Sequence, residues 1–130
     1  MKTQLVTDRK TLKIICINFS NGKKHDFRLF KESHIHTVQD VKIETDTGYI
    51  GIKAIHQNSC HPKKRSKNNP LTKEDKVQNH EISKERIYVE HAIRLIKRFC
   101  IVAERYRNRR KRFSLRFSLI VGICNFELNG

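Results

Sequence analysis

The sequence lacks any long hydrophobic run. No apolar segment in the 130 residues approaches the roughly 20 that are needed to cross a bilayer. The longest candidate runs only from Phe117 to Cys124, and the opening residues, Met1 to Gln4, lack the apolar core of a signal peptide. We therefore expect a cytoplasmic protein without a membrane partner.

The sequence also lacks paired cysteines. Its four cysteines contain no C-x-x-C pair and are spread along the chain, at Cys16, Cys60, Cys100 and Cys124. The seven histidines are scattered too, so that no set of Cys and His has the spacing of a zinc site. This pattern disfavours a disulfide scaffold or a zinc ribbon, and we expect reduced thiols.

Acidic residues are scarce. There are 28 Lys and Arg against 13 Asp and Glu, which gives a formal net charge of +15. Such a balance favours a polyanionic partner, nucleic acid first and an acidic membrane surface second. With 37% hydrophobic residues, the chain is too apolar to be fully disordered, and its length is typical of one domain.

The first third of the chain has the pattern of β-structure. Two β-prone runs, residues 4–7 and 12–19, flank a polar turn and predict a hairpin. Residues 26–33 could form a short helix. Residues 41–45 alternate as a strand does and end at Asp46-Thr47-Gly48, where glycine permits a sharp turn.

The rest of the chain predicts helices and basic segments. Residues 61–70 contain both prolines and four basic residues and predict a loop, and residues 71–80 could form a helix. A helix over residues 83–104 is indicated by Ser83 as its N-cap and by one apolar stripe, made of Val89, Ile93, Ile96, Cys100 and Ala103. Residues 113–128 fit a helix face and a strand alternation equally well.

Three polar residues share one side of the helix over 83–104. At about 100° per residue, Arg86, Glu90 and Lys97 lie within about 40° of one another. Glu90 falls at the edge of the apolar stripe, and its basic neighbours would keep it ionised. This arrangement suits a metal ligand or a phosphate-binding site, but an ordinary ion pair on a solvated helix would look the same.

Two further acidic positions are ambiguous. Asp46 closes a strand, where a carboxylate commonly faces a site, but Asp-x-Gly is also ordinary turn chemistry. His25-Asp26 could be a catalytic dyad, and it is more often simply the start of a helix. Neither position identifies a site by itself.

The positive charge is concentrated near the C-terminus. Residues 94–116 contain ten basic residues and one acid, Glu104, with residues 105–112 as the densest segment. Such density predicts salt-dependent binding to DNA phosphates. The candidate DNA-binding residues in this region are Lys97, Arg98, Arg105, Arg107, Arg109, Arg110, Lys111 and Arg112. A solvated helix end followed by a turn is the alternative.

Taken together, these motifs resemble the C-terminal part of DDE-type insertion-sequence transposases, which are DDE superfamily endonucleases. Their Arg-x3-Glu-x6-Lys signature appears as Arg86, Glu90 and Lys97. The other matching segments run through almost the whole chain: residues 2–4, 22–26 with 29–30, 46–51, 62–64, 71–74, 79–83, 97–99, 106–107 and 113–125.

The resemblance implies a fold and a set of roles. The fold would be α/β, a ribonuclease-H-like mixed sheet with flanking helices. Asp46 would be the second and Glu90 the third of three carboxylates that hold two Mg²⁺ or Mn²⁺ ions for cutting and joining DNA. Arg86 and Lys97 would position DNA phosphates. His25 and Asp26 match a recurring family motif without being metal ligands.

One departure from the family pattern is a serine, Ser83, where many relatives carry tyrosine; we interpret it as a subgroup feature. A second departure bears on activity. The first catalytic Asp belongs to a strand that would precede the opening pair of strands, and no Asp here matches its context. We therefore expect residues 1–130 to be a truncated catalytic domain that lacks its first strand, holds the ions weakly and does not cleave DNA alone.

Two origins would explain such a chain: a decayed gene copy, or the downstream half of a transposase encoded in two reading frames. Its partners would be transposon-end and target DNA, and either an upstream half or another transposase copy. Bound to DNA, it would be nucleoid-associated. The competing hypotheses are a non-catalytic basic nucleic-acid-binding module and an inert remnant.

Overall fold

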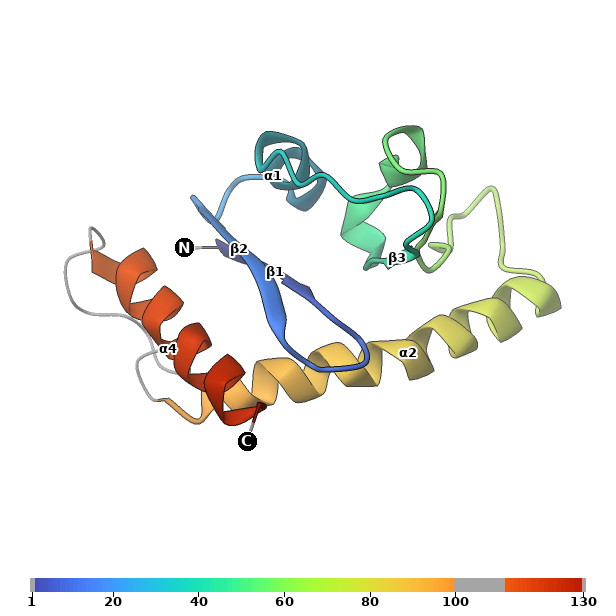
Figure 1. Ribbon diagram of the computed structural model, residues 1–130. Coiled ribbons are helices and arrows are strands. Elements are labelled where there is room, and N and C mark those ends of the chain that lie inside the picture. Colours follow the sequence, from blue (N-terminus) through green and yellow to red (C-terminus); the bar gives the residue numbers. More distant parts are fainter. Residues whose placement is uncertain (1, 100–111, 130) are drawn as a thin grey trace. The chain divides into compact units, whose positions relative to one another are not determined.

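A computed structural model describes residues 2–99 and 112–129 (Figure 1). Within these residues the fold is mixed α/β, with two small sheets and three helices, so the predicted class is confirmed at this level. The chain forms two compact units. We call Met1–Phe19 with Ile87–Gly130 the terminal unit, and Ser20–Arg86 the central unit.

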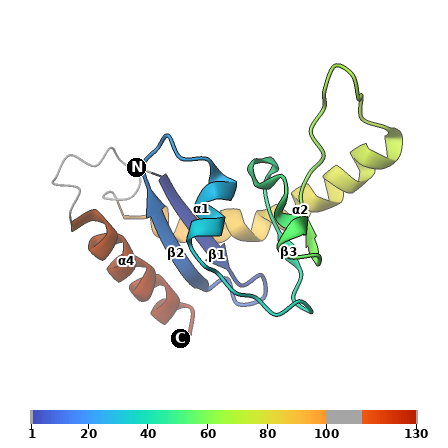
Figure 2. The same cartoon turned by 90° about the horizontal axis from the view of Figure 1, so that it is seen from above.

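The terminal unit begins with the predicted hairpin. Strands β1 (Lys2–Thr7) and β2 (Ile14–Ser20) pair in a two-stranded sheet and lie side by side in Figures 1 and 2. The connection between them is far shorter than a parallel crossover requires, so the pair is antiparallel. Asp8 closes the turn, because its backbone N–H donates to the Lys13 carbonyl at 2.9 Å.

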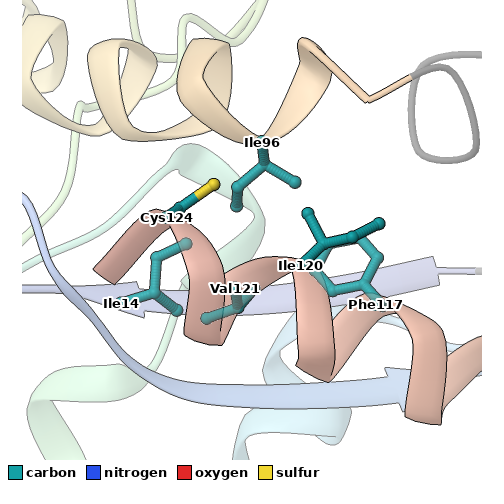
Figure 3. Close-up of a cluster of buried hydrophobic side chains, with 6 residues drawn as sticks. All are labelled: Ile14, Ile96, Phe117, Ile120, Val121 and Cys124. Carbon is teal, nitrogen blue, oxygen red and sulfur yellow. The ribbon is translucent and has the colours of Figure 1, made fainter. Parts of the chain in front are cut away.

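Helix α4 (Phe113–Glu127) supplies most of the core of the terminal unit. Four of its side chains pack with Ile14 of β2 and Ile96, as Figure 3 shows: Phe117, Ile120, Val121 and Cys124. Asn125 also binds β2, accepting from the Ile14 N–H at 2.9 Å and donating to the Ile14 carbonyl at 2.8 Å. The segment whose periodicity was ambiguous is therefore a helix.

Helix α2 (Lys73–Lys97) joins the helix predicted over residues 71–80 to the one predicted from Ser83, and it ends at Lys97. It begins with a capping box rather than at Ser83: the Asp75 N–H donates to Thr72 Oγ1 at 3.1 Å, and the Thr72 N–H donates to Asp75 Oδ2 at 3.1 Å. Ser83 lies inside the helix, where its hydroxyl donates to the Asn79 carbonyl at 2.9 Å.

The buried face of α2 also differs from the predicted stripe. Ile82, Ala92 and Ile96 are buried, whereas Val89 is 37% exposed. Glu90 is exposed rather than at the edge of a buried face. The predicted stripe members Cys100 and Ala103 lie outside the described residues.

The central unit contains a short parallel pair of strands. β3 (Ile43–Glu44) pairs with β4 (Ser59–Cys60), with Ile43 opposite Ser59. Only two residues of the predicted strand 41–45 are in the ladder. Two 3-10 turns lie between the strands, Thr47–Tyr49 and Ile52–Ala54.

Residues 61–70 form a loop with one isolated β-bridge, between Ser66 and Asn69, and are tied to α2 through Lys63. The Lys63 N–H donates to Asn79 Oδ1 at 2.8 Å, and Asn79 Nδ2 donates to the Lys63 carbonyl at 3.0 Å. Lys63 Nζ also forms an ion pair with Asp75 Oδ2 at 2.9 Å. The other three basic side chains of this segment, Lys64, Arg65 and Lys67, are exposed.

A residue with strained backbone follows helix α1 (Asp26–Glu32) and its C-cap. His34 follows the C-cap Ser33 with φ of 50° and is exposed. The left-handed conformation costs an L-residue about 1 kcal/mol, and glycine adopts it freely. We expect His34→Gly to raise the free energy of unfolding by about 0.5–1 kcal/mol in urea titrations. His36→Gly, at an exposed position without positive φ, is the control and should not stabilise; a gain equal to that of His34→Gly would contradict the account.

Candidate functional site

Asp46 lies two residues beyond strand β3 and caps the first 3-10 turn. Its Oδ1 accepts a hydrogen bond from the Thr47 backbone N–H at 2.6 Å. A carboxylate is well suited to this place, because it satisfies an N–H that the turn leaves free. The Asp46 side chain is still 53% exposed, so its oxygens remain accessible to a ligand.

Arg86 of α2 lies beside Asp46 in the central unit. Its Nη2 is 3.5 Å from Asp46 Oδ2, and both side chains are about half exposed. At that exposure, solvent screens most of the attraction, and the pair adds little to stability. Its importance is local: the structure brings two of the predicted site residues together and places a positive charge next to an accessible carboxylate.

Helix α1 lies against the segment that follows Asp46. The Phe30 and Tyr49 rings meet edge to face, with their centroids 6.2 Å apart. Gly51 has φ of 100°, and a Cβ there would be only 3.2 Å from the Phe27 ring. Asp26 approaches Gly48 in the same way. His25, by contrast, is exposed and caps α1 without a side-chain hydrogen bond.

The position of Tyr49 against α1 changes the pKa of its hydroxyl. Burial raises the pKa of Tyr49 to about 12, and the carboxylates of Asp26 and Asp46 contribute. The unfolded chain loses this proton near its ordinary pKa of about 10, whereas the folded state retains it. We expect the free energy of unfolding to fall as the pH rises from about 10 to 12, and to fall less in Tyr49→Phe. Urea titrations at several pH values test this; identical pH profiles for the two proteins would contradict it.

Sequence reasoning missed a charged group at the β3–β4 pair. Lys42 Nζ lies 2.9 Å from Glu44 Oε1, and this hydrogen bond raises the pKa of Lys42. Burial raises the pKa of the nearby Cys60 thiol, which keeps that cysteine protonated and poorly nucleophilic. Alternation of lysine and glutamate along one strand was the available signal, but it is common on solvated strands.

The remaining predicted residues do not gather at Asp46 within the central unit. Glu90, Lys97, Arg98 and Arg112 belong to the terminal unit and are exposed. Arg98 is already engaged, because its Nη2 pairs with Glu127 Oε2 and its Nε donates to the Leu95 carbonyl at 3.1 Å. Five predicted DNA-binding residues lie outside the described part of the chain: Arg105, Arg107, Arg109, Arg110 and Lys111.

The described residues contain neither a metal-binding cluster nor a membrane-spanning helix. Residues 2–99 and 112–129 contain no group of three or more His, Cys, Asp or Glu side chains that could hold a metal ion. None of their helices is both long and apolar enough to cross a membrane. Within the described residues, therefore, Asp46 has a basic neighbour but no cluster of acidic ones.

Comparisons with known proteins give a consistent result. Residues 1–125 match a family described as DDE superfamily endonuclease. The chain is 48% identical, over 128 residues, to a probable transposase for insertion sequence element IS702 from Microchaete diplosiphon. That alignment covers 98% of this chain and 46% of the relative, so the chain spans about half of the relative's length. No solved structure matches the chain.

Proposed function

This chain belongs to the DDE superfamily endonucleases, and from that membership we propose that it supplies two catalytic carboxylates, Asp46 and Glu90, of an insertion-sequence transposase that cuts and joins DNA. The observation that carries the proposal is the pairing of Asp46 with Arg86 at 3.5 Å. Asp46 is an accessible carboxylate two residues past a parallel strand, and Arg86 is the first residue of the Arg-x3-Glu-x6-Lys signature.

The chemistry of the two acids fits a divalent cation. Mg²⁺ and Mn²⁺ prefer carboxylate oxygens, and both side chains are exposed. Two carboxylates bind such ions weakly, and residues 2–99 and 112–129 contain no group of three or more His, Cys, Asp or Glu side chains that could hold a metal ion. When bound, the ions would activate a water or a 3′-hydroxyl and stabilise the leaving oxygen.

The basic residues would hold DNA at these acids. Arg86 places its guanidinium next to Asp46 and offsets part of the repulsion between that carboxylate and a DNA phosphate. Lys97 follows Glu90 by seven residues on α2, about 10 Å along the same side of the helix, where it could reach a second phosphate. Arg98, Arg112 and the segment 105–111 would extend this surface along the DNA.

We further propose that the fold is ribonuclease-H-like and incomplete in this chain. Two separate two-stranded sheets, one antiparallel and one parallel, would be parts of one five-stranded mixed sheet in an intact relative. The fifth strand would carry the first catalytic Asp. An upstream transposase half or another transposase copy would supply it, and the assembly would act in the cytoplasm on nucleoid DNA.

Mn²⁺ binding tests the two carboxylates. We expect the full chain to bind Mn²⁺ weakly in calorimetric titrations, and Asp46→Ala or Glu90→Ala to abolish the signal, because each removes one of two carboxylate ligands. Glu74→Ala removes an exposed acid elsewhere on α2 and should change nothing. Equal Mn²⁺ affinity in all four proteins would overturn the proposal.

A non-catalytic nucleic-acid-binding module is the second candidate, favoured by the ten basic residues in 94–116. DNA cleavage separates the two. We expect no cleavage by the chain alone, and Mg²⁺-dependent cleavage once a polypeptide carrying the first Asp strand is added. The module would be favoured if the mixture binds DNA but never cleaves it. In that case DNA binding should also be unaffected by Asp46→Ala and Glu90→Ala.

A further inference from the structure

The Asp26 carboxylate lies in the space that a side chain at position 48 would enter. A Cβ built on Gly48 would lie 2.6 Å from Asp26 Oδ2 and 3.4 Å from its Cβ and Cγ. Gly48 does not have a positive φ; among the described glycines only Gly51 does. A larger residue at position 48 would therefore require the Asp26 carboxylate to move.

The same face of α1 holds the whole segment 48–51. Asp26, Phe27 and Phe30 lie within about 100° on the helix and contact Gly48, Gly51 and Tyr49 respectively. Phe30 is buried, at 6% exposure, and its burial fixes which face of α1 packs against the segment 48–51. A segment held at Gly48, Tyr49 and Gly51 cannot rotate freely, and Asp46 caps the turn that begins it, Thr47–Tyr49.

We propose that Asp26 is a positioning residue for Asp46: its close approach to Gly48 fixes the turn and thereby directs the Asp46 carboxylate. The turn transmits the effect because Asp46 Oδ1 is bound to the Thr47 N–H, one residue before Gly48, at 2.6 Å. With Oδ1 held there, Oδ2 points to Arg86. The significance for catalysis rests on the proposed function of Asp46, whereas the positioning itself does not.

The Thr47 amide reports the position of Asp46 directly. In the full chain, its proton resonance should be shifted downfield by the hydrogen bond to Asp46, and Asp46→Ala should remove that shift. We expect Asp26→Ala to lose much of the shift while the protein still melts cooperatively. Glu32→Ala, which removes a carboxylate from another face of α1, is the matched control and should leave the Thr47 amide unchanged.

Gly48→Ala tests the same contact from the other side and remains informative if Asp26→Ala does not fold. Its added Cβ should displace the turn and move the Thr47 resonance. The double variant Asp26→Ala/Gly48→Ala should recover part of the downfield shift of the Thr47 amide that Gly48→Ala loses. The reason is that the double variant lacks the Asp26 oxygen that the new Cβ would meet. The proposal is overturned if the effects of the two substitutions simply add in the double variant. It is also overturned if the Thr47 amide does not move in whichever single variant folds.

Mn²⁺ affinity, measured on the same proteins, links the contact to the site. We expect Asp26→Ala to weaken Mn²⁺ binding roughly 10- to 100-fold, as loss of a residue that orients a metal ligand does. If the Thr47 amide moves in Asp26→Ala but Mn²⁺ affinity is unchanged in Asp46→Ala, the proposed function is wrong and the positioning role of Asp26 stands. Mn²⁺ binding that depends on Asp46 and ignores Asp26 would overturn the positioning alone.

Discussion

Phe117→Ala is expected to lower the free energy of unfolding by about 3–5 kcal/mol, the range found when a buried phenylalanine is truncated. Phe117 is 6% exposed and belongs to the core cluster of the terminal unit. Its ring meets Phe19 edge to face at 5.4 Å and Phe113 at 5.8 Å, so truncation removes both ring contacts and leaves a cavity. Because domains are stable by only about 5–15 kcal/mol, this loss is a large fraction of the total.

Leu119→Ala is the matched control for this prediction. Leu119 lies two residues further along α4 and is 60% exposed, so the change should stay within about 0.5 kcal/mol. Urea unfolding followed by circular dichroism measures both variants. Equal losses would contradict the core assignment, and the absence of a cooperative transition in the unaltered chain would favour the inert remnant.

The state of residues 113–128 could not be predicted because both faces of the helix are apolar. Phe117, Ile120 and Cys124 form the buried face, while Leu115, Leu119, Ile123 and Phe126 are between 48% and 78% exposed. Apolar residues on all sides erase the difference between a helical and an alternating pattern. Only contacts with Ile14 and Ile96, distant in sequence, decide which face is covered.

The start of α2 illustrates a different limit. Two segments, Thr72 to Asp75 and Ser83 to Glu85, both have the composition of a helix start. Thr72 and Asp75 form the reciprocal bonds of a capping box, and Ser83 instead bonds back to Asn79 within the helix. Serine and threonine hydroxyls satisfy backbone groups in either setting, so that composition alone does not separate a cap from a helix interior.

The candidate site was partly predictable for a clear physical reason. Asp46 and Arg86 could be named as candidates from local signals, a carboxylate after a strand and a fixed spacing along a helix, whereas their roles came from the resemblance to DDE transposases. The approach of Asp26 to Gly48 leaves no such signal, since it joins residues 22 positions apart through a loop. What the sequence does show is two closely spaced glycines, Gly48 and Gly51, and each is crowded by a residue of α1.

DNA affinity is expected to fall steeply with salt, by roughly 10³–10⁵-fold between 50 and 200 mM, if six to ten basic residues contact phosphates. Nine are proposed: Arg86, Lys97, Arg98, Arg105, Arg107, Arg109, Arg110, Lys111 and Arg112. Each neutralised phosphate contributes about −0.9 to the slope of log affinity against log salt, so the full set would give a slope near −8. Titration of a labelled duplex by fluorescence anisotropy at several salt concentrations measures this slope.

Neutralising Arg107, Arg109 and Arg110 together should make the slope shallower by about 2.7, because three counterion-releasing contacts are lost. The control is a second triple variant, in which three exposed residues of the segment 61–70 are changed to alanine: Lys64, Arg65 and Lys67. Both triples lower the net charge from +15 to +12, as three cations are removed from each. If DNA binding only reflects total charge, the two slopes will change equally, which would contradict a specific role of residues 105–112 in DNA binding.

Asp46→Ala and Glu90→Ala extend the same titration to the acids. Removing a carboxylate near DNA takes away repulsion without removing a phosphate contact, so the slope should stay unchanged and the affinity should rise slightly. Different measurements therefore report on the two groups of residues. The basic residues set the salt dependence of DNA binding, and the acids set the affinity for Mn²⁺. A slope that becomes shallower on Asp46→Ala would mean that Arg86 needs Asp46 to hold it against the DNA, and would make their 3.5 Å pair part of the binding surface itself.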